Sequence, residues 1–261
     1  MKIASWNVNS IKARLPAVMD WLKESETDVL LLQEIKCVDG NFPALEFSDA
    51  GYQTAVHGQK TYNGVAIVSK YGLSDIRSGL PGDETDTEAR YIDAVVDGWL
   101  RVASIYLPNG NPVDGPRLPY KLAWMDRLLA HAGDLLGSEE SFVLGGDYNV
   151  IPQDSDAHDP SKWAGDALAL PESRSRFRAL LNLGLTEAFR ALHPERVAFT
   201  FWDYQGGAWQ KDDGIRIDHL LLSPQAADRL AACDVDKKPR GRPKASDHTP
   251  IWCEIEAAAA P

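Results

Sequence analysis

Short apolar runs recur along the chain, and most of them end on a polar side chain. The run 28–33, DVLLLQ, is almost continuously apolar, which is typical of a strand covered on both faces. Turn signals such as Asn63-Gly64 and Asp97-Gly98 separate several of the runs. The pattern predicts strands at 2–8, 28–33, 65–69, 91–96, 100–107, 197–202, 215–222 and 251–255, and one that starts at Ser141 and leads into Asp147.

The stretch 141–152, SFVLGGDYNVIP, is the one around which we expect the chain to be organised. Side chains alternate across a strand, so Asp147 and Asn149 should share a face. Gly145 and Gly146 weaken a strand unless a ligand or another segment comes close to the backbone there. We therefore interpret the stretch as the floor of an active site, with a plain strand that ends in an Asp/Asn turn as the alternative.

Apolar residues that recur with a helical step predict helices between the strands. Pro16 is expected in the first turn of a main helix that follows a short turn, and Gly137 and Gly184 are expected to close two later helices. The expected helices are 11–22, 118–136, 174–183 and 186–192.

The order of these elements predicts an α/β fold. Strand pairs dominate at 91–107 and again after 197, so two packed mixed sheets with helices outside fit better than one doubly wound parallel sheet. With 261 residues, 44% hydrophobic content and no linker rich in Pro, Gly or Ser, we expect a single domain over 1–261. The closing AAAAP at 257–261 is expected to be a frayed tail.

The sequence lacks the signals of export and of membrane insertion. Its start, MKIASWNVN, has no basic region followed by an apolar one, and no run of about 18 apolar residues occurs. Cys37, Cys233 and Cys253 are an odd number without CxxC spacing, which argues against a disulfide framework and a zinc site. We expect a cytoplasmic protein without a membrane partner, and nothing requires more than a monomer.

The formal net charge of −11 argues against a nucleic-acid partner if only the sum is considered. However, the run 237–244, KKPRGRPK, is strongly basic and precedes Asp247 and His248. Such a run is usually a solvated loop. Beside a candidate catalytic pair it indicates phosphate steering, because an acidic body with one basic rim repels DNA everywhere else. The acidic loop 151–160 lacks the spacing of a calcium loop and is expected to be solvated.

Polar side chains at the strand ends predict a common site. At one strand end such a residue is ordinarily a turn former, a helix start or a half-buried aromatic. Because polar residues recur at the ends of several strands, they indicate an oxygen-rich pocket, provided that these strand ends lie on one rim of the fold. Carboxylate and amide oxygens without thiolates suit a hard cation, Mg²⁺ or Mn²⁺, and disfavour zinc. The side chains concerned are Asn7, Glu34, Tyr106, Asp147, Asn149 and Asp218, supplemented by Asp247.

His248 is the one histidine in a catalytic context, within Ser-Asp-His-Thr-Pro before the last strand. A lone histidine is more often structural, but Asp218 is available as an orienting carboxylate, and the pair could bind phosphate or handle a proton. On the strand 215–222, Asp218 shares its face with two leucines and should point inward. His219 faces the other way and is expected to be structural.

Seven motifs stand in order along the chain: WNVNSI (6–11), LQEIK (32–36), HGQKTYNGVAI (57–67), YLPNG (106–110), GGDYNVIP (145–152), RIDHLL (216–221) and SDHTPI (246–251). No single motif is specific, but the ordered set covers essentially the whole chain. Together they closely resemble the exonuclease III family, the bacterial branch of the apurinic/apyrimidinic endonucleases in the endonuclease/exonuclease/phosphatase superfamily. The resemblance implies a DNase I-like, four-layered α/β/β/α sandwich of two mixed β-sheets flanked by helices.

The resemblance also implies a metal-dependent DNA repair nuclease. The expected reaction is hydrolysis of the phosphodiester on the 5' side of an abasic site, leaving a 3'-hydroxyl, together with 3'-to-5' exonuclease and 3'-phosphatase activity. Attack by water adds negative charge to the non-bridging oxygens and to the departing 3'-oxygen, so a cation and nearby donors must stabilise both. The expected cofactor is Mg²⁺, with Mn²⁺ as substitute, and the expected partner is double-stranded DNA with abasic sites or blocked 3' ends.

Carried over by motif, the metal environment falls on Asn7, Glu34, Asp147, Asn149, Asp247 and His248. Asp147 would orient and deprotonate the attacking water, and Asn149 would hold the water or the phosphate. His248, paired with Asp218, would bind the scissile phosphate, and Tyr106 would bond the phosphate or assist the leaving group. Two points stay open because these groups titrate as a coupled set: whether one or two cations act, and whether Asp147 or His248 accepts the proton.

Four basic and three aromatic residues are expected to contact DNA. The basic residues could instead lie on a solvated face, and at least one aromatic could belong to the core. The family often shows the aromatic pair near 200 as Trp then Phe, whereas this chain has Phe201-Trp202, so either ring could face the base-less sugar. The pocket or wedge for that sugar would reject an intact base by shape. The candidates are Lys36, Arg90, Lys121 and Arg216 for phosphates, and Phe201, Trp202 and Trp209 for the sugar.

Two other functions are compatible with the sequence. One is a superfamily phosphodiesterase or phosphatase that acts on RNA or small phosphorylated substrates, although LQEIK, YLPNG and the basic run favour DNA. The other is a non-catalytic DNA-binding relative, against which the intact polar set argues. Turnover of a small phosphorylated metabolite without DNA cleavage would support the first, and DNA binding without magnesium-dependent cleavage the second.

Overall fold

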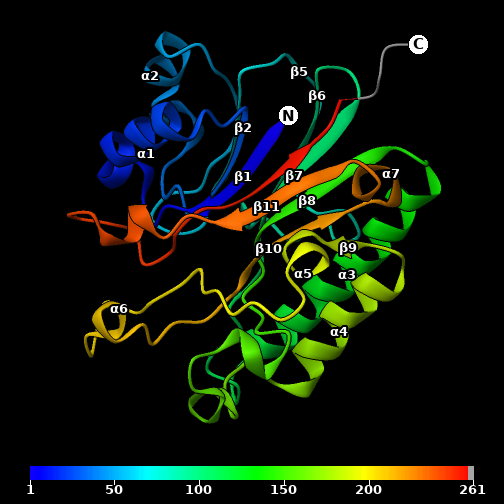
Figure 1. Ribbon diagram of the computed structural model, residues 1–261. Coiled ribbons are helices and arrows are strands. Elements are labelled where there is room, and N and C mark those ends of the chain that lie inside the picture. The colour runs from blue at the N-terminus through cyan, green and yellow to red at the C-terminus, as the bar shows by residue number, and fades with distance from the viewer. Residues whose placement is uncertain (258–261) are drawn as a thin grey trace.

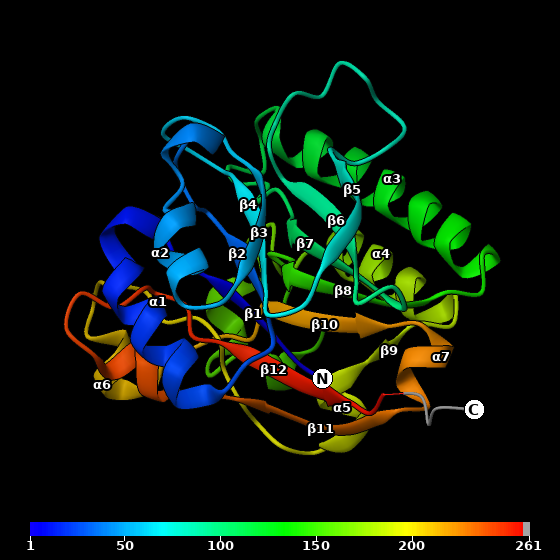
Figure 2. The same cartoon turned by 90° about the horizontal axis from the view of Figure 1, so that it is seen from above.

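Two six-stranded mixed sheets pack against each other, and helices cover the outer face of each (Figure 1). The computed structural model describes residues 1–257, so the expected frayed tail lies outside the described residues except for Ala257. Figure 2 shows the helices α1 (Ile11–Ser25) and α2 (Ala44–Asp49) on one side, and α3 (Arg117–Gly137) and α4 (Pro171–Asn182) on the other. The predicted four-layered α/β/β/α sandwich is confirmed.

The first sheet has the strand order β11-β12-β1-β2-β4-β3. Its parallel pair, β1 and β2, is joined by α1, and its other pairs are antiparallel. Its strands are β1 (Lys2–Asn7), β2 (Val29–Gln33), β3 (Gln53–His57), β4 (Val65–Ser69), β11 (Leu230–Val235) and β12 (Ile251–Ile255).

The second sheet repeats this arrangement with the order β5-β6-β7-β8-β10-β9. Here β7 and β8 are parallel and α3 joins them, so both halves of the chain contain the same strand, helix, strand unit. Its strands are β5 (Leu73–Ser78), β6 (Tyr91–Val96), β7 (Leu100–Tyr106), β8 (Ser141–Asp147), β9 (Thr186–Glu187) and β10 (Asp218–Leu222).

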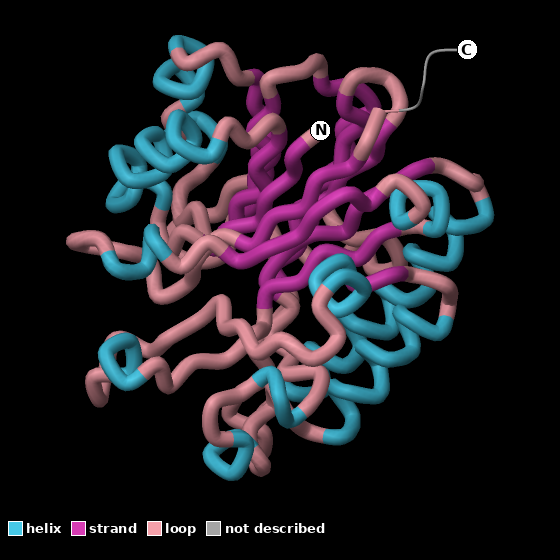
Figure 3. Tube along the Cα trace, viewed as in Figure 1, coloured by secondary structure: helices cyan, strands magenta, loops and turns pink. Residues whose placement is uncertain are grey.

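Short helices occupy the connections between the strands (Figure 3). None of the helices formed by residues 1–257 has the length and hydropathy that a membrane crossing requires. The remaining elements are α5 (Ala188–Leu192), α6 (Ala208–Lys211), α7 (Pro224–Ala227), η1 (Asp39–Asn41), η2 (Asp154–Asp156), η3 (Pro160–Trp163) and η4 (Lys238–Gly241).

The inner faces of the two sheets form an apolar core that includes Leu31, Val143 and Leu220. Gly145 of β8 faces the other sheet, and a Cβ atom there would lie 2.6 Å from Leu31 Cδ1 and 2.7 Å from Leu220 Cδ2. The close approach predicted at this glycine is therefore made by core leucines and not by a ligand. It lets the sheets pack tightly directly beneath Asp147.

Two of the expected secondary-structure elements are wrong. The strand 197–202 does not form, because Phe201 pairs with two different segments, at Ile215 and at His248, as isolated bridges. The expected helix 186–192 is divided into β9 and α5, because the Glu187 carboxylate accepts the Arg190 backbone N–H at 2.8 Å and so caps a helix that starts at 188.

Several boundaries also differ from the sequence-based expectation; for example, α4 begins at Pro171 and not at 174, and α1 extends to Ser25. Pro16 lies inside α1, because the helix already begins at Ile11, where Ser10 accepts the first bond from Arg14. Gly137 is the last residue of α3 and does not cap it; the capping position is Ser138. The expected strand 215–222 begins only at Asp218, because Ile215 pairs with the loop residues Ala157 and Phe201.

Candidate active site

The two sheets bring their polar strand ends to one edge. Within the second sheet, Asp147 of β8 stands directly opposite Tyr106 of β7 on one side and Asp218 of β10 on the other. In the first sheet, Asn7 ends β1 beside the end of β2, from which Glu34 follows. The predicted common rim is therefore present, and it lies where β1 and β8 face each other between the sheets.

Asn7 joins the carboxylates of the two sheets. Its side-chain Nδ2 donates to Glu34 Oε1 at 2.8 Å and to Asp147 Oδ2 at 3.0 Å, while its Oδ1 accepts the Asn9 backbone N–H at 3.1 Å. Asn7 is fully buried and Asp147 is 2% exposed. Two carboxylate oxygens thus converge on one amide group in a nearly dry site.

Burial raises the pKa of Asp147 to about 7, and the nearby Asp218 carboxylate adds to this effect, whereas His248 and Asn7 oppose it. For Glu34 burial acts in the same direction, but hydrogen bonds from Asn7 and Lys36 outweigh it and lower its pKa. The two carboxyl groups therefore differ: Glu34 stays ionised, and Asp147 is poised to exchange a proton near neutral pH.

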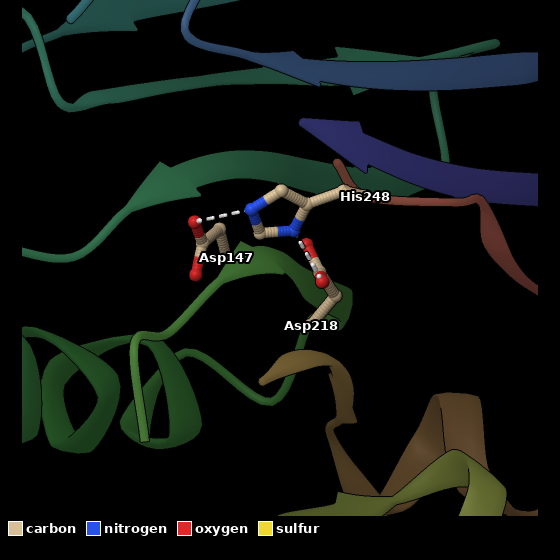
Figure 4. Close-up of side chains that lie close together, drawn as sticks. All are labelled: Asp147, Asp218 and His248. Atoms are coloured by element: carbon tan, nitrogen blue, oxygen red, sulfur yellow. Dashed lines mark hydrogen bonds and ion pairs between the residues drawn. The ribbon is translucent and has the colours of Figure 1, made fainter. Parts of the chain in front are cut away.

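His248 lies between two carboxylates (Figure 4). Its Nδ1 is 2.8 Å from Asp218 Oδ2, and its Nε2 is 3.7 Å from Asp147 Oδ2. Burial disfavours the charged imidazole, but Asp218 and Asp147 outweigh burial and raise the pKa of His248 to about 10. At neutral pH both ring nitrogens carry protons, so His248 is a hydrogen-bond donor. The predicted pairing with Asp218 and the inward direction of Asp218 are confirmed.

Asn149 reaches the site by a turn and not by strand alternation. Strand β8 ends at Asp147, and Asn149 adopts a left-handed backbone with φ of 47° while its N–H donates to Asp147 Oδ1 at 2.9 Å. Its Nδ2 donates to the Leu107 carbonyl at 2.9 Å, and its Oδ1 accepts from Asn109 Nδ2 at 3.0 Å. The expected shared strand face is wrong. Asn109 was not predicted as part of the site, although it also follows a strand end, in YLPNG.

Lys36 and Asp247 belong to a second chain of contacts at the rim. Lys36 Nζ lies 2.9 Å from Glu34 Oε2 and donates to Asn9 Oδ1 at 2.5 Å. Asn9 Nδ2 in turn donates to Asp247 Oδ1 at 3.1 Å. The structure thus links Asp247 to Glu34 through Asn9 and Lys36. Asn9 was not predicted, and its spacing of two from Asn7 in WNVNS was the available signal.

Tyr106 and Arg90 line a cavity of about 280 Å³ at the same rim. The Arg90 guanidinium carbon is 4.9 Å from the centre of the Tyr106 ring, and its Nε donates to Glu88 Oε2 at 2.5 Å. Burial and the carboxylates of Glu34 and Asp147 raise the pKa of the Tyr106 phenol well above its ordinary value. Tyr106 therefore keeps its proton and can act as a hydrogen-bond donor.

Comparison with known proteins places this geometry in a family. The profile of the Endonuclease/Exonuclease/phosphatase family matches residues 4–248, which include every strand end described above. The chain belongs to this family. Its curated relatives include the Exodeoxyribonuclease III of Haemophilus influenzae, which is 32% identical over 98% of this chain and 100% of the relative.

Solved structures of the family are also similar. The 3'-5' exonuclease NExo of Neisseria meningitidis superposes with a TM-score of 0.95 at 40% identity, covering 98% of this chain and 100% of that one. A second NExo structure, from Neisseria, described as a 3' phosphatase bound to a product DNA hairpin, has the same identity, coverage and TM-score. An AP endonuclease from Archaeoglobus fulgidus matches with a TM-score of 0.94 at 36% identity, covering 98% of this chain and 100% of that one.

Three residues that the family resemblance placed at DNA are inaccessible in this family member. Lys121 and Trp202 are fully buried, and Arg216 is 1% exposed. Trp202 packs edge-on against Trp209 with ring centres 5.0 Å apart, and its Nε1 donates to Asp212 Oδ1 at 2.9 Å. The expectation of direct DNA contact is wrong for these three because their polar groups and rings are committed to the interior.

Arg216 is held by a buried acidic pair. Its Nε donates to Asp156 Oδ1 and its Nη1 to Glu187 Oε1, each at 2.9 Å, and Arg190 Nη2 also donates to Asp156 at 2.5 Å. Asp156 is fully buried, so the expectation that the acidic loop 151–160 is solvated is wrong for this residue. His219 Nδ1 lies 3.1 Å from Arg216 Nη1 and its Nε2 lies 3.2 Å from the Val150 carbonyl, inside the protein, as predicted for a structural histidine.

The basic run 237–244 is only partly free. Arg240 is buried, donates to the Trp202 carbonyl at 3.0 Å and stacks near the Tyr204 and Trp209 rings. Lys237 is exposed but lies 2.8 Å from Asp212 Oδ1, and Arg242 pairs with Glu24. Lys238 and Lys244 are exposed. A smaller basic rim than the sequence suggested is therefore available to an anionic partner.

The aromatic candidates separate by burial. Phe201 is half-buried and its ring lies 5.0 Å from the His248 imidazole. Trp209 is also half-buried, on α6, where it packs on Trp202. Of the adjacent pair 201–202, Phe201 is the ring that borders the site.

The site has the donors that a metal-dependent nuclease of this family needs. Asp147, Asp218 and His248 present ligand atoms within 4.8 Å of one another. His248 Nδ1 is engaged by Asp218 Oδ2, and its Nε2 faces Asp147 Oδ2. The carboxylates of Glu34 and Asp147, which share Asn7, offer oxygens, and burial is the main cause of the raised pKa of Asp147. Oxygen donors of this kind fit a hard divalent cation.

Proposed function

We propose that the chain is a metal-dependent DNA repair nuclease of the exonuclease III type. It hydrolyses the phosphodiester on the 5' side of an abasic site and leaves a 3'-hydroxyl, and it also has 3'-to-5' exonuclease and 3'-phosphatase activity on double-stranded DNA. The observation that carries the proposal is the position of Asp147, a buried carboxyl that contacts Asn7 on one side and faces the protonated His248 on the other. The relatives, described as an exodeoxyribonuclease, a 3'-5' exonuclease and an AP endonuclease, support it.

Asp147 is the proposed proton acceptor for the attacking water. A pKa of about 7 matches the operating pH, which is the condition for efficient general base catalysis. The water oxygen bonds to phosphorus, its proton passes to the Asp147 carboxylate, and the bond between phosphorus and the 3'-oxygen breaks. The departing 3'-oxygen takes a proton from Tyr106 or from solvent and becomes the 3'-hydroxyl. Asn149 orients the water or the phosphate, because its amide is fixed by Leu107 and Asn109.

His248 and Tyr106 are the proposed donors to the phosphate. Asp218 holds the imidazole at Nδ1, so the Nε2 proton is free to bind a phosphate oxygen and its positive charge offsets the charge that develops there. Because the pKa of His248 is raised to about 10, it is charged at neutral pH and is a poor base, which favours Asp147 as the acceptor. The Tyr106 hydroxyl supplies a further donor to the phosphate or to the leaving 3'-oxygen.

We infer Mg²⁺ as the cofactor, with Mn²⁺ as substitute. Glu34 and Asn7 would hold it, while Asp147, Asn149, Asp247 and His248 border this set. When bound, the cation supplies positive charge against the oxygens of the scissile phosphate. The proposal covers a site that binds one cation or two.

Four of the predicted DNA contacts remain in the proposal. Lys36 and Arg90 lie at the rim, where phosphates would approach, and Phe201 and Trp209 are the aromatic candidates for the base-less sugar. We further propose that the partner is double-stranded DNA with abasic sites or blocked 3' ends. We also propose that residues 1–261 form a single domain and that the protein is a monomer located in the cytoplasm.

A substrate panel tests the proposed function. The chain is incubated with a duplex that carries one abasic-site analogue, an undamaged duplex, a duplex with a 3'-phosphate, a matched RNA and a small phosphomonoester, each with magnesium or with a chelator. We expect magnesium-dependent incision at the 5' side of the lesion, removal of the 3'-phosphate, and slower digestion of the undamaged duplex from its 3' ends.

The other outcomes separate the alternatives. Digestion from 3' ends without incision at the lesion would remove the abasic-site assignment while keeping the hydrolytic site. Turnover of RNA or the phosphomonoester alone would favour a different phosphodiesterase or phosphatase. DNA binding without cleavage of any substrate would show a non-catalytic relative.

A further inference from the structure

Lys121 is a fully buried lysine next to the candidate active site, with no carboxylate among its hydrogen-bond partners. It lies in the first turns of α3, and its Nζ donates to three backbone carbonyls: Asn149 at 2.5 Å, Asn109 at 3.0 Å and Ala167 at 3.3 Å. Burying a lysine is costly unless its donors are satisfied, and only the ammonium form has three N–H donors for three acceptors. Burial lowers the pKa of Lys121 to about 7, with Asp147 and Asp166 opposing this effect, while the three carbonyls match the three N–H groups of the ammonium form.

The three carbonyls belong to three loops that are distant in sequence. Asn109 follows β7, Asn149 follows β8, and Ala167 precedes α4. Other contacts join the same loops: Asn109 Nδ2 donates to Asn149 Oδ1 at 3.0 Å, and the Ala167 backbone N–H donates to Asn111 Oδ1 at 3.2 Å. Lys121 is the residue that contacts all three loops with one group.

Asn149 has a backbone that needs such support. Its φ of 47° lies in the left-handed region, which costs a non-glycine residue free energy unless its surroundings hold it there. Lys121 binds the carbonyl of this residue, and the Asp147 carboxylate accepts its N–H. These two contacts hold the backbone from which the side chain projects, and the Leu107 carbonyl and Asn109 hold the side-chain amide itself.

Gly110 leaves the space through which Lys121 reaches the loops. A Cβ atom on Gly110 would lie 2.6 Å from Lys121 Cδ and 3.0 Å from Ala167 Cβ, and its φ of 93° also favours glycine. Lys121 can therefore occupy its buried position only because residue 110 is a glycine.

We propose that Lys121 is a positioning residue for the hydrolytic site: its amino group fixes the carbonyls of Asn109, Asn149 and Ala167, and thereby aims the Asn149 amide at the reacting phosphate or water. The inference rests on the proposed function for the role of Asn149. It assigns to Lys121 an effect on turnover through Asn149, without contact with DNA.

The test compares Lys121→Met, Asn149→Ala and the double variant, with Arg127→Met as the matched control. Arg127 lies on the same helix and also donates to backbone carbonyls, those of Leu80 at 3.0 Å and Pro81 at 3.2 Å, but at another loop. For Lys121→Met we expect kcat on the abasic duplex to fall at least tenfold while the dissociation constant for DNA changes less than threefold. In the Asn149→Ala background the same substitution should change kcat less than threefold.

Arg127→Met should lower the melting temperature while keeping kcat. A kcat of folded Lys121→Met within threefold of wild type, or a full tenfold loss in the Asn149→Ala background, would overturn the inference. If Lys121→Met does not fold, Gly110→Ala takes its place, since its Cβ displaces the lysine stem. The same loss and the same dependence on Asn149 are expected of it, and wild-type kcat in folded Gly110→Ala would refute the role.

A spectroscopic readout separates this inference from the proposed function. In ¹⁵N-labelled protein, the side-chain amide resonance of Asn149, assigned by its absence in Asn149→Ala, should shift or broaden in Lys121→Met and stay in place in Arg127→Met. An unchanged resonance would contradict the positioning role even if the enzyme cleaves DNA. A wild-type chain that cleaves nothing would contradict the proposed function while the resonance still reports on Lys121.

Discussion

At the scale of single residues, position in the chain does not determine exposure, as Phe201 and Trp202 show. Trp202 is fully buried with its indole N–H bonded to Asp212, whereas Phe201 packs on His248 and is half-buried. Sequence left both rings as candidates for the base-less sugar. Adjacent residues in an extended segment point to opposite sides, so only one of the two can border the site.

We predict that alanine substitution separates these two rings. Trp202→Ala removes a fully buried indole and should lower the free energy of unfolding by about 3–5 kcal/mol. Phe201→Ala should cost less stability but reduce the preference for the abasic over the undamaged duplex roughly tenfold, about 1.4 kcal/mol in transition-state free energy. Denaturant unfolding and kcat/KM on both duplexes measure this. Equal stability losses with unchanged preference would remove Phe201 from the sugar site.

At the scale of elements, interior strands were predictable from sequence and edge strands were not. The runs that predicted β1, β2, β4, β6, β7, β8, β10 and β12 are mostly apolar because these interior strands are covered by the other sheet on one face and by helices or loops on the other. The strands without a correct prediction, β3, β5, β9 and β11, all lie at sheet edges. In β5, for example, all residues except Leu73 are exposed, so its sequence LSDIRS lacks the apolar pattern of a strand.

The candidate site shows a similar division. Asn7, Glu34 and Asp147 could be predicted because each ends or follows an apolar strand. Asp218 is the first residue of β10, which runs antiparallel to β8 and therefore starts at the same edge of the sheet. The role of Lys121 could not be predicted from the sequence, because its three carbonyl partners lie on three loops that come together only in the complete fold. From sequence alone, a lysine in a helix is expected to be exposed to solvent.

The buried ion pairs that join β9 and β10 to the loop at Asp156 predict a pH dependence of stability. Burial opposes ionisation of Glu187, but Arg216 and His219 outweigh it and lower the pKa of Glu187 from 4.5 to about 2. Because the folded pKa lies below the unfolded one, this stabilisation is complete above pH 4.5 and is lost as the pH falls toward 2. By linkage it is on the order of 3 kcal/mol.

Denaturant unfolding of the wild type and of Glu187→Gln between pH 7 and pH 2 measures this contribution. The stability of Glu187→Gln should already be lower at pH 7, because the substitution leaves Arg216 with one carboxylate fewer, and should fall less between pH 4.5 and pH 2. Glu172→Gln, at an exposed position on α4, is the control. Parallel curves for the wild type and Glu187→Gln would show that Glu187 is not the titrating group.

At the scale of the whole molecule, an acidic protein must concentrate its positive charge to bind DNA. The net charge is −11, and much of the basic run 237–244 is neutralised by contacts within the protein, such as Lys237 with Asp212. Lys238 and Lys244 stay exposed. The usable part of the basic rim is therefore smaller than the sequence suggests.

We predict that Lys238→Gln combined with Lys244→Gln weakens DNA binding and reduces the slope of log K against log salt by up to about 2, since each phosphate contact contributes about 1. Binding isotherms at several salt concentrations measure the slope. The matched control is Lys23→Gln with Arg178→Gln, two exposed cations on α1 and α4. An equal change in slope for both pairs would indicate a general charge effect and no localised rim.

The central claim is that Asp147 is the proton acceptor of a hydrolytic site, and a single-turnover measurement on Asp147→Asn tests it most directly. The variant and the wild type are compared on the abasic duplex with saturating magnesium, and DNA binding is measured separately. We predict that Asp147→Asn folds and binds DNA with similar affinity but cleaves at least roughly 10²-fold more slowly, because the amide cannot take the proton from water. Cleavage by folded Asp147→Asn at a rate close to that of the wild type would contradict the account.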